Sequence, residues 1–312
     1  MNRIEVKSIP FVERPFCPLC GASSREIHIS FPDIPVVRCS SCSFLYSSKL
    51  MAGNSLSEYY RQGFGSDRHR QGQYINARIN AWAIRHLVPL SEIHSFLDVG
   101  AGYGFLLQQM TRRKIRSVGV ELSEQEARYG QGQLGVDIHN STLEKSSLLK
   151  DSFDLVACFE VIEHIPDPPM FLDELLSYVK PGGYLIVMTD NFESRVAREL
   201  GPGFPKWIPH SHISHFGPET LKRLFMDKGI EVVSRLSYTP WELLARLYYF
   251  KLRGVRQSPE NTFNLSDVLT QEMHGHFRLF HLRRVVNLLW ARLTAQPNLD
   301  GALMYLLGRR KS

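Results

Sequence analysis

The sequence predicts an α/β protein with a largely parallel sheet and a small N-terminal module that contains four cysteines. Two observations support this fold class. Short apolar runs alternate with helical patterns from residue 73 onward, and a glycine-rich turn follows the first of these runs. Two Cys-x-x-Cys pairs also stand within the first 42 residues. We therefore expect a cysteine module at 1–52, a linker at 53–72 and the main domain at 73–312.

Length and composition agree with this layout. At 312 residues, 43% of them hydrophobic, the chain can bury a sizeable core, and no apolar run approaches the roughly 18 residues of a membrane span. The first residues show no apolar signal region, so a cytoplasmic location is expected. The formal net charge is +6, and residues 241–312 account for all of it with eleven Lys and Arg against five Asp and Glu.

The glycine-rich turn predicts a binding site for a cofactor. Residues 96–104 form an apolar run that contains Asp98 and ends with three glycines in five positions. Such glycines allow positive φ angles and close approach of the backbone to a ligand, and the helix expected at 105–113 would point its N-terminal amides at that ligand. A turn of this kind also occurs in ordinary loops and in dinucleotide folds, so the order of the later elements decides between these.

Those later elements alternate between strands and helices. The apolar run 115–120 ends at Glu121, where an acid can accept both hydroxyls of a ribose. Ser123 is the expected N-cap of the next helix, with Glu126 completing a capping box. The remaining expected elements are helices at 73–88, 124–133 and 170–179 and strands at 136–138, 154–159 and 184–189. This order implies a parallel sheet with right-handed crossovers.

At this point the chain resembles the class I S-adenosylmethionine-dependent methyltransferases. The resemblance rests on the glycine turn and on four later segments, 119–123, 153–156, 160–168 and 179–183. A nicotinamide-binding Rossmann domain, the main rival, does not require the last two segments. The resemblance implies a Rossmann-like seven-stranded sheet whose sixth strand lies at 230–236 and whose last strand, at 302–309, is antiparallel. It also implies S-adenosylmethionine as the cofactor.

The resemblance assigns the cofactor residues position by position. Asp98 and the turn would hold the amino-acid end of the cofactor, Glu121 would bind its ribose and Leu122 would flank the adenine. The implied set is Asp98, Gly100, Ala101, Gly102, Gly104, Glu121, Leu122, Thr142, Leu143 and Glu160. Structural alternatives remain, because Asp98 and Glu121 can also cap helix N-termini, where a carboxylate contributes up to about 1 kcal/mol. Glu163 and His164 either border the opening of the cofactor and substrate site or only close a turn through side-chain hydrogen bonds.

The two cysteine pairs predict a structural metal site. Cys17 and Cys20 are separated from Cys39 and Cys42 by 18 residues, a spacing typical of a four-cysteine zinc ribbon. Two disulfides are the alternative, and the expected reducing compartment favours Zn²⁺. Four thiolates leave no open coordination position, so a structural rather than catalytic ion is expected. Its removal should unfold roughly residues 14–50.

Residues 237–301, between the last two strands, predict a helical insertion. Leu, Phe, Val and Trp recur at helical spacing in 241–252 and 266–294, with arginines on other faces. Three interpretations stay open: a lid or dimer-forming cap, a basic cap that grips substrate phosphates, or a surface that docks peripherally on an anionic membrane.

A histidine-rich loop is the expected chemical centre beyond the cofactor. His210, His212 and His215 follow Trp207 and precede a Phe-x-Pro-Glu-Thr-Leu segment. With the cysteine module, this loop resembles bacterial saccharide and secondary-metabolite methyltransferases, including the deoxysugar C-methyltransferases. Their loop has Glu and Tyr where this chain has Ser211 and His215, so C-methylation of a nucleotide-linked ketosugar does not carry over. A second metal site and a purely structural role in the loop are alternatives for these histidines.

The expected reaction is methyl transfer to a small-molecule acceptor, namely a saccharide, a nucleotide-linked or lipid-linked sugar, or a secondary metabolite, with phosphate on the acceptor as one option. The sulfonium leaving group is already activated, so the protein must mainly align the acceptor and remove its proton. A neutral imidazole suits the second task. We expect His212 to be the base and His210 and His215 to orient the substrate.

Two other function classes remain open. RNA is the alternative acceptor, because the pI is about 9.1 and a zinc-binding N-terminus also precedes ribosomal RNA methyltransferase cores. A non-catalytic protein-docking scaffold is the other alternative, which the intact Asp98, glycine turn and Glu121 oppose. No DNA partner is expected, and the chain is expected to be a monomer or a homodimer.

Overall fold

A seven-stranded sheet forms the centre of the computed structural model, which describes residues 10–61, 66–254, 258–259 and 278–311. Its strands are β6 (Ser95–Val99), β7 (Arg116–Glu121), β8 (Asp137–Asn140), β9 (Phe153–Phe159), β10 (Val179–Asp190), β12 (Glu231–Tyr238) and β13 (Leu303–Arg309). Their order is β12–β13–β10–β9–β6–β7–β8. β6 to β10 are mutually parallel, whereas β13 is antiparallel to both β10 and β12. The antiparallel last strand is confirmed.

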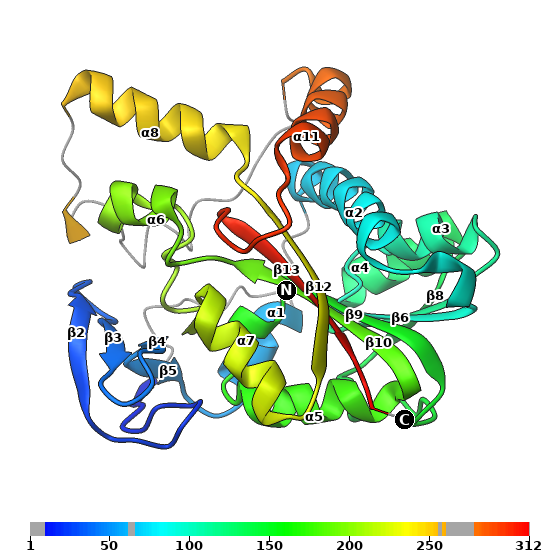
Figure 1. Cartoon of the computed structure of the whole chain (residues 1–312), viewed down its shortest axis with the longest axis horizontal. Helices are drawn as coiled ribbons and strands as arrows, with labels where there is room; N and C mark the ends of the chain where they lie inside the picture. The colour runs from blue at the N-terminus through cyan, green and yellow to red at the C-terminus, as the bar shows by residue number, and fades with distance from the viewer. Residues whose placement is uncertain (1–9, 62–65, 255–257, 260–277, 312) are drawn as a thin grey trace.

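Helices cover both faces of this sheet (Figure 1). They are α2 (Asp67–Leu87), α3 (Phe105–Thr111), α4 (Glu124–Tyr129), α5 (Pro168–Tyr178) and α7 (Pro218–Asp227). A further helix, α6 (Arg195–Leu200), lies beside the sheet in a cluster with residues of the N-terminal module such as Phe31. Short helical turns are η2 (Leu90–Glu92), η3 (Gly130–Leu134), η4 (Ile162–His164) and η5 (Gly201–Gly203). Alternate strand residues feed two cores, because side chains along a strand point to opposite faces. Phe96 packs with α2 and α3, whereas Leu97 packs with α5 and α7. Ser123 caps α4 as expected, its hydroxyl accepting from the amide of Glu126 at 3.3 Å.

Residues 53–72, expected to be a linker, are largely helical. They contain α1 (Ser55–Arg61) and the start of α2, which begins at Asp67 rather than at residue 73. The hydroxyl of Ser66 caps α2 by accepting from the amide of His69 at 3.1 Å. Because α1 has no buried residue, its sequence shows no apolar stripe and its polar composition suggests a linker.

The N-terminal module is joined to the main domain by a shared sheet. It contributes β2 (Arg25–Ile29), β3 (Val36–Cys39) and β4 (Leu45–Ser47), while β1 (Phe11–Glu13) pairs with β5 (Lys49–Met51). The fourth strand is β11 (Ser214–His215), which comes from the histidine loop and pairs antiparallel with β4. Phe44 and Tyr46 of the module share a core cluster with main-domain residues such as Leu224. The module therefore packs on the sheet instead of standing apart.

The described part of the segment between β12 and β13 contains α8 (Trp241–Arg253) and α11 (Phe280–Thr294). They lie along one edge of the molecule, at the top of Figure 1, and α11 packs next to α2. The indole N–H of Trp241 donates to Asn287 Oδ1 at 2.7 Å and so joins the two helices. Part of the predicted insertion, including residues 266–277, lies outside the described residues. None of the helices in the described part of the chain is both long and apolar enough to cross a membrane.

Candidate active site

The glycine turn after β6 has the backbone conformation that its sequence predicts. Gly100, Gly102 and Gly104 have φ angles of 82°, 54° and 79°, which side-chain-bearing residues rarely adopt. A Cβ at Gly100 would lie 2.4 Å from Val161 Cγ2, and one at Gly104 would lie 2.7 Å from Val136 Cγ2. Glycine is therefore required here by both conformation and space.

Two carboxyl groups border this turn, as expected for a cofactor site. Asp98 is buried in β6, and Glu121 ends β7, the neighbouring strand. Glu121 accepts hydrogen bonds from the amides of Gly102 at 2.8 Å and Ser123 at 2.7 Å, so it also holds the turn and the start of α4. Burial and the charge of Glu121 raise the pKa of Asp98 to about 7. Burial and the charge of Glu126 likewise raise the pKa of Glu121 to about 7.

This pair of carboxyl groups fits the polar end of S-adenosylmethionine. A buried carboxylate is destabilised unless a cation or a hydrogen-bond donor faces it. The cofactor brings an ammonium group and two ribose hydroxyls, and Asp98 and Glu121 would bind them. The capping role of Glu121 and its ribose role are compatible, since each of its oxygens can accept more than one hydrogen bond.

The residues expected around the adenine lie next to Glu121. Asn140 Nδ2 donates to the carbonyl groups of Glu121 at 2.9 Å and Leu122 at 3.0 Å, which fixes the end of β7 beside the end of β8. Leu143 is buried, and its carbonyl accepts from the hydroxyl of Tyr178 at 3.1 Å. The Oγ1 atom of Thr142 is buried and has no hydrogen-bond partner among the described residues. An unsatisfied hydroxyl at this place fits a polar ligand edge such as adenine.

The sequence did not reveal that α2 closes over the glycine turn. Gln73 Oε1 accepts from the amide of Tyr103 at 3.0 Å, and its Nε2 donates to Glu126 Oε2 at 2.7 Å. His69 Nε2 lies 3.3 Å from Glu126 Oε1. Glu126 is the one residue of this contact that the sequence pattern singles out, and the pattern assigns it to the capping box of α4 and not to a contact with α2.

A second charged cluster lies where β9 and β10 end. Glu160 follows β9 with a strained φ of 54°, and Asp190 is the last residue of β10. Lys206 Nζ lies 3.1 Å from Glu160 Oε1 and 3.3 Å from Asp190 Oδ2. Asn76 Nδ2 of α2 donates to Glu160 Oε2 at 3.0 Å. Glu160 was expected at this mouth, whereas Asp190 and Lys206 were not identified.

The charges of this cluster follow from its burial. Burial alone would raise the pKa of Glu160, but attraction to Lys206 and their hydrogen bond outweigh it and lower that pKa. Burial raises the pKa of Asp190 to about 6, although Lys206 opposes the shift. Burial and the carboxylates of Asp190 and Glu160 raise the pKa of Glu163 to about 8. At neutral pH the cluster therefore holds one ammonium, two carboxylates and the protonated Glu163.

The structure brings His212 to this cluster. Its Nδ1 lies 3.8 Å from Asp190 Oδ2, and its ring packs edge-on against His164 at 4.7 Å. His164 Nδ1 lies 2.9 Å from the carbonyl oxygen of Ser211 and 2.6 Å from the hydroxyl of Tyr60 in α1. Burial lowers the pKa of His164 to about 4 and that of His212 well below its ordinary value, so both rings are neutral at pH 7.

The other two predicted histidines occupy different surroundings. His215 is buried in β11, where its ring packs against Phe192 at 4.5 Å and Trp207 at 4.9 Å. His210 is buried with its ring edge-on to Tyr59 at 5.9 Å. Burial lowers the pKa of His210 to about 4 and that of His215 well below the ordinary value. His212 is the one of the three that lies beside Asp190, as given above.

A cleft of ≈ 260 Å³ opens above this cluster. Glu160, Asp190 and Lys206 form part of its lining. The helical segment between β12 and β13 adds aromatic side chains, Trp241 and Trp290. The cleft thus lies at the carboxyl ends of parallel strands, where open α/β sheets bind ligands.

The four N-terminal cysteines form a second, separate site. Their Sγ atoms all lie within 4.8 Å of one another, with Cys17 to Cys42 at 3.5 Å and Cys20 to Cys39 at 3.6 Å. Tetrahedral zinc with Zn–S bonds of about 2.3 Å needs sulfurs about 3.8 Å apart, so this set fits such an ion. None of the four forms a disulfide in this structure. The fifth cysteine, Cys158, is buried in β9.

Comparisons with known proteins identify the family. Residues 58–235 match the family described as a methyltransferase domain. This stretch is more than half of the chain, and its sheet order and glycine turn are described above. The chain belongs to this family of S-adenosylmethionine-dependent methyltransferases.

Curated relatives include two ubiquinone biosynthesis O-methyltransferases. The protein from Aeromonas salmonicida is 29% identical over 158 residues, which cover 46% of this chain and 66% of the relative. The one from Aromatoleum aromaticum is 31% identical over 158 residues, which cover 46% of this chain and 68% of the relative. The chain thus spans about two thirds of the length of these relatives.

Solved structures share the fold. A methyltransferase from Thermotoga maritima superimposes with a TM-score of 0.50 at 20% identity, covering 76% of this chain and 89% of its own. A chain from the complex of the Haloferax volcanii Trm112 activator with a methyltransferase superimposes with a TM-score of 0.52 at 15% identity. The superposition covers 82% of this chain and 98% of that one. At these identities the likeness concerns the fold alone.

Proposed function

We propose that this chain transfers the methyl group of S-adenosylmethionine to a hydroxyl group of a small, ring-containing acceptor. The observation that carries the proposal is the cleft, in which aromatic walls meet a floor of Glu160, Asp190 and Lys206 beside His212. The acceptor classes that fit are a saccharide, a nucleotide-linked or lipid-linked sugar, and an aromatic secondary metabolite. Transfer to oxygen also agrees with the O-methyltransferase names of the two relatives.

The floor of the cleft favours an acceptor that donates hydrogen bonds. Lys206 is already held by Glu160 and Asp190, so the three groups together carry a net negative charge at neutral pH. A hydroxyl can donate to these carboxylates, whereas a phosphate would be repelled by them. If the acceptor carries a phosphate, as the sequence allows, that phosphate would have to bind away from Glu160, Asp190 and Lys206.

The walls of the cleft suit a flat or ring-shaped molecule. The indole N–H of Trp290 donates to the carbonyl oxygen of Thr239 at 2.9 Å, and that of Trp241 is bonded to Asn287. With their polar atoms already satisfied, the two indoles present apolar surface to the cleft. Such surface stacks well on sugar or aromatic rings.

His212 is the proposed general base. Bound S-adenosylmethionine would supply a methyl group on an activated sulfonium. The neutral ring of His212 would take the acceptor proton at Nε2, and Asp190 would stabilise the resulting imidazolium through Nδ1. Glu160, which lies at both the cofactor mouth and the cleft, would help to align the acceptor hydroxyl.

The four cysteines are proposed to bind one structural Zn²⁺. The sulfur geometry supports this, as does the local backbone. The amides of Gly21 and Ser43 donate to the carbonyls of Cys17 and Cys39, each at 2.9 Å, which closes the tight turns that aim both thiols of each pair inward. Such an ion would hold the module and has no place in the proton transfer.

The test combines acceptor identification with a base variant. Protein and S-adenosylmethionine labelled in its methyl group are incubated with fractionated extract of the native host lacking the gene. We expect label in nucleotide sugars, glycolipids or small metabolites, and His212→Ala should bind the cofactor normally while losing about 10²–10⁴-fold in turnover. The surface variant His94→Ala is the control and should keep full turnover.

Three outcomes would contradict the proposal. Label in RNA would favour the RNA alternative. Absence of cofactor binding would favour the scaffold alternative. Full turnover by His212→Ala would remove that histidine from the mechanism.

A further inference from the structure

One face of α11 carries an exposed apolar stripe. Leu282, Val286, Leu289 and Leu293 are between 37% and 82% exposed, and their spacing of four, three and four residues places them on one side of the helix. The stripe is about 16 Å long at 1.5 Å per residue. The opposite side of α11 is the one that packs into the protein, because Leu288 and Ala291 are buried in the core.

The neighbouring helix α8 adds more apolar surface to the same edge of the molecule (Figure 1). Tyr248, Tyr249 and Leu252 are exposed, the last of them by 86%. The buried side of α8 is formed by Leu243 and Leu247. Both helices therefore have a core-facing side and an apolar outer side, and nothing among the described residues covers the outer sides.

Positive charge surrounds this apolar surface. Residues 241–254 and 278–294 contain seven basic side chains and one acidic side chain, Glu242. Glu242 faces inward to Arg283 at 3.8 Å. Lys251 pairs with Glu199, whereas Arg246, Arg253 and Arg292 have no ion-pair partner within the described part of the chain. By helical spacing, Arg246 and Arg253 flank the apolar side of α8, and Arg292 flanks the stripe of α11, so the apolar surface has basic margins.

We propose that the outer sides of α8 and α11 dock on the surface of an anionic lipid bilayer. Leucine, valine and tyrosine side chains can enter the headgroup region, while arginine and lysine attract anionic lipids. A second copy of the chain is a poorer occupant, because a two-fold contact would set this cationic surface against itself. RNA is also a poorer occupant, because a stripe of leucine and valine does not stack on bases as aromatic side chains do.

Docking in this way has a consequence for the acceptor. The inner sides of the same two helices line the cleft through Trp241, Asn287 and Trp290. A bound bilayer would therefore lie close to the cleft, and the acceptor would be an amphiphile whose apolar tail stays in the membrane. This consequence rests on the proposed methyl transfer, whereas the docking itself does not.

The test is co-sedimentation of the full-length protein with vesicles of phosphatidylcholine alone or of phosphatidylcholine with 30% phosphatidylglycerol. The apolar variant is Leu282→Gln, Leu289→Gln and Leu293→Gln combined, and the charge variant is Arg253→Gln with Arg292→Gln, two exposed arginines beside the apolar surface. The control is Ile27→Gln with Leu149→Gln, two apolar side chains that are 65% and 78% exposed elsewhere. Affinity for S-adenosylmethionine, measured by calorimetry, verifies that each variant is folded.

We expect at least tenfold tighter binding of the wild type to the anionic vesicles. The apolar variant should bind them at least tenfold more weakly, the charge variant should lose most of its salt dependence, and the control should match the wild type. Absence of binding to anionic vesicles, or equal binding by wild type and apolar variant, overturns the proposal. Two other results would also overturn the proposal. One is that the wild type is a dimer without lipid and the apolar variant is a monomer; the other is that the wild type binds RNA and the charge variant does not. Loss of cofactor binding in the wild type would instead overturn the proposed function.

Discussion

The cofactor side of the site, around the glycine turn, and the acceptor side, around Asp190 and His212, are built over very different sequence distances. On the cofactor side, Asp98, the turn and Glu121 lie within 24 residues and at the ends of two adjacent strands. On the acceptor side, Glu160, Asp190 and His212 span 53 residues: the two acids stand at the ends of adjacent strands, but His212 and Lys206 reach them from a loop. The cofactor side is thus fixed by the sheet, whereas the acceptor side needs support from elsewhere.

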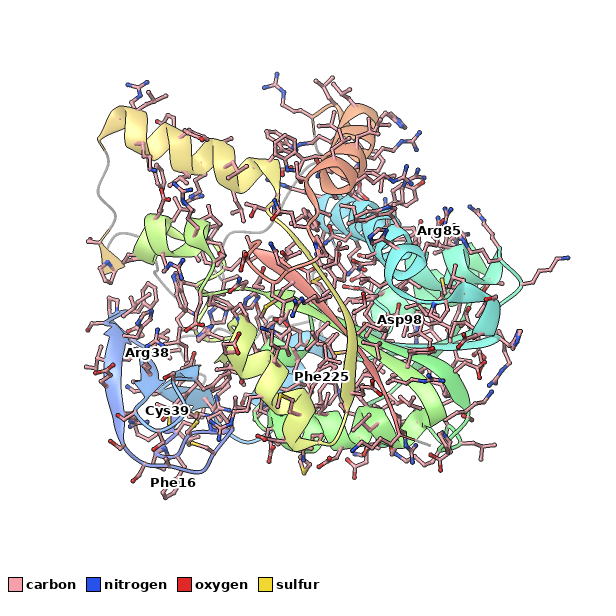
Figure 2. All side chains as sticks on the ribbon, viewed as in Figure 1. Phe16, Arg38, Cys39, Arg85, Asp98 and Phe225 are labelled. Carbon is pink, nitrogen blue, oxygen red and sulfur yellow. The ribbon has the colours of Figure 1, made fainter. Side chains whose placement is uncertain are left out.

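The cysteine module supplies much of that support. The amide of Ser47 donates to the carbonyl of Ile213 at 3.1 Å, and Arg14 Nη1 donates to the same oxygen at 2.9 Å. Ile213 follows His212 directly. Figure 2 shows Cys39 in the module and Asp98 in the main sheet, well apart in the view. An ion bound by the four cysteines, far from the chemistry, would therefore support the acceptor side and leave the cofactor side intact.

The largest expected effect comes from breaking the metal site. Cys39→Ser should lower bound zinc from one equivalent to none and reduce methyl transfer by on the order of 100-fold or more, because β11 and the histidine loop lose their neighbours. Affinity for S-adenosylmethionine should change less than threefold. Zinc is measured by atomic absorption, and Ser41→Ala, in the same turn, is the control. A zinc-free protein with normal transfer would show that the module does not hold the acceptor side.

A smaller effect is expected from titrating the cofactor side. The pKa of Asp98 is about 7 in the folded protein against an ordinary value of 3.8, so its contribution to stability is full at low pH and is lost as the pH rises through 7. We expect the cofactor-free protein to lose about 2 kcal/mol between pH 5.5 and 8 from this group. Urea unfolding measures it, and Asp98→Asn should remove this part of the pH dependence and leave the part that comes from Glu121.

Added cofactor should flatten the same curve, because its ammonium stabilises the ionised carboxylate. A wild-type stability that rises over this pH range would contradict the placement of Asp98.

The smallest expected effect comes from removing the cation on the acceptor side. Lys206→Met leaves Glu160 and Asp190 without their shared partner. This should cost about 1–2 kcal/mol at pH 7, because Glu160 is partly exposed and the buried Asp190, whose pKa is already raised, can take up a proton. The loss should shrink at pH 5, where protonation relieves the repulsion. Lys222→Met, which breaks an exposed pair with Glu219 at 2.8 Å, is the control and should cost less than about 0.5 kcal/mol. Equal losses at both pH values would mean that the carboxylates do not depend on Lys206.

The same contrast explains what the sequence could reveal. The glycine turn, Glu121 and the four cysteines were predictable because local spacing and adjacent strands determine where they lie. Lys206 and Gln73 reach the site through long-range packing and carry no sequence pattern. Asp190 had a weak signal, since it directly follows the expected strand at 184–189. The two-residue strand β11 was too short to show alternation.

That short strand also defines which parts of the chain can be exchanged between related enzymes. Ser214 and His215 pair with Tyr46 and Leu45, so the cysteine module and the histidine loop complete one another's sheet. A chimera that takes only the histidine loop from a relative would pair a foreign β11 with the native β4. A chimera that takes only the cysteine module would pair a foreign β4 with the native β11. Residues 10–51 and 204–217 would therefore have to be exchanged together in such a chimera, despite their separation in the sequence.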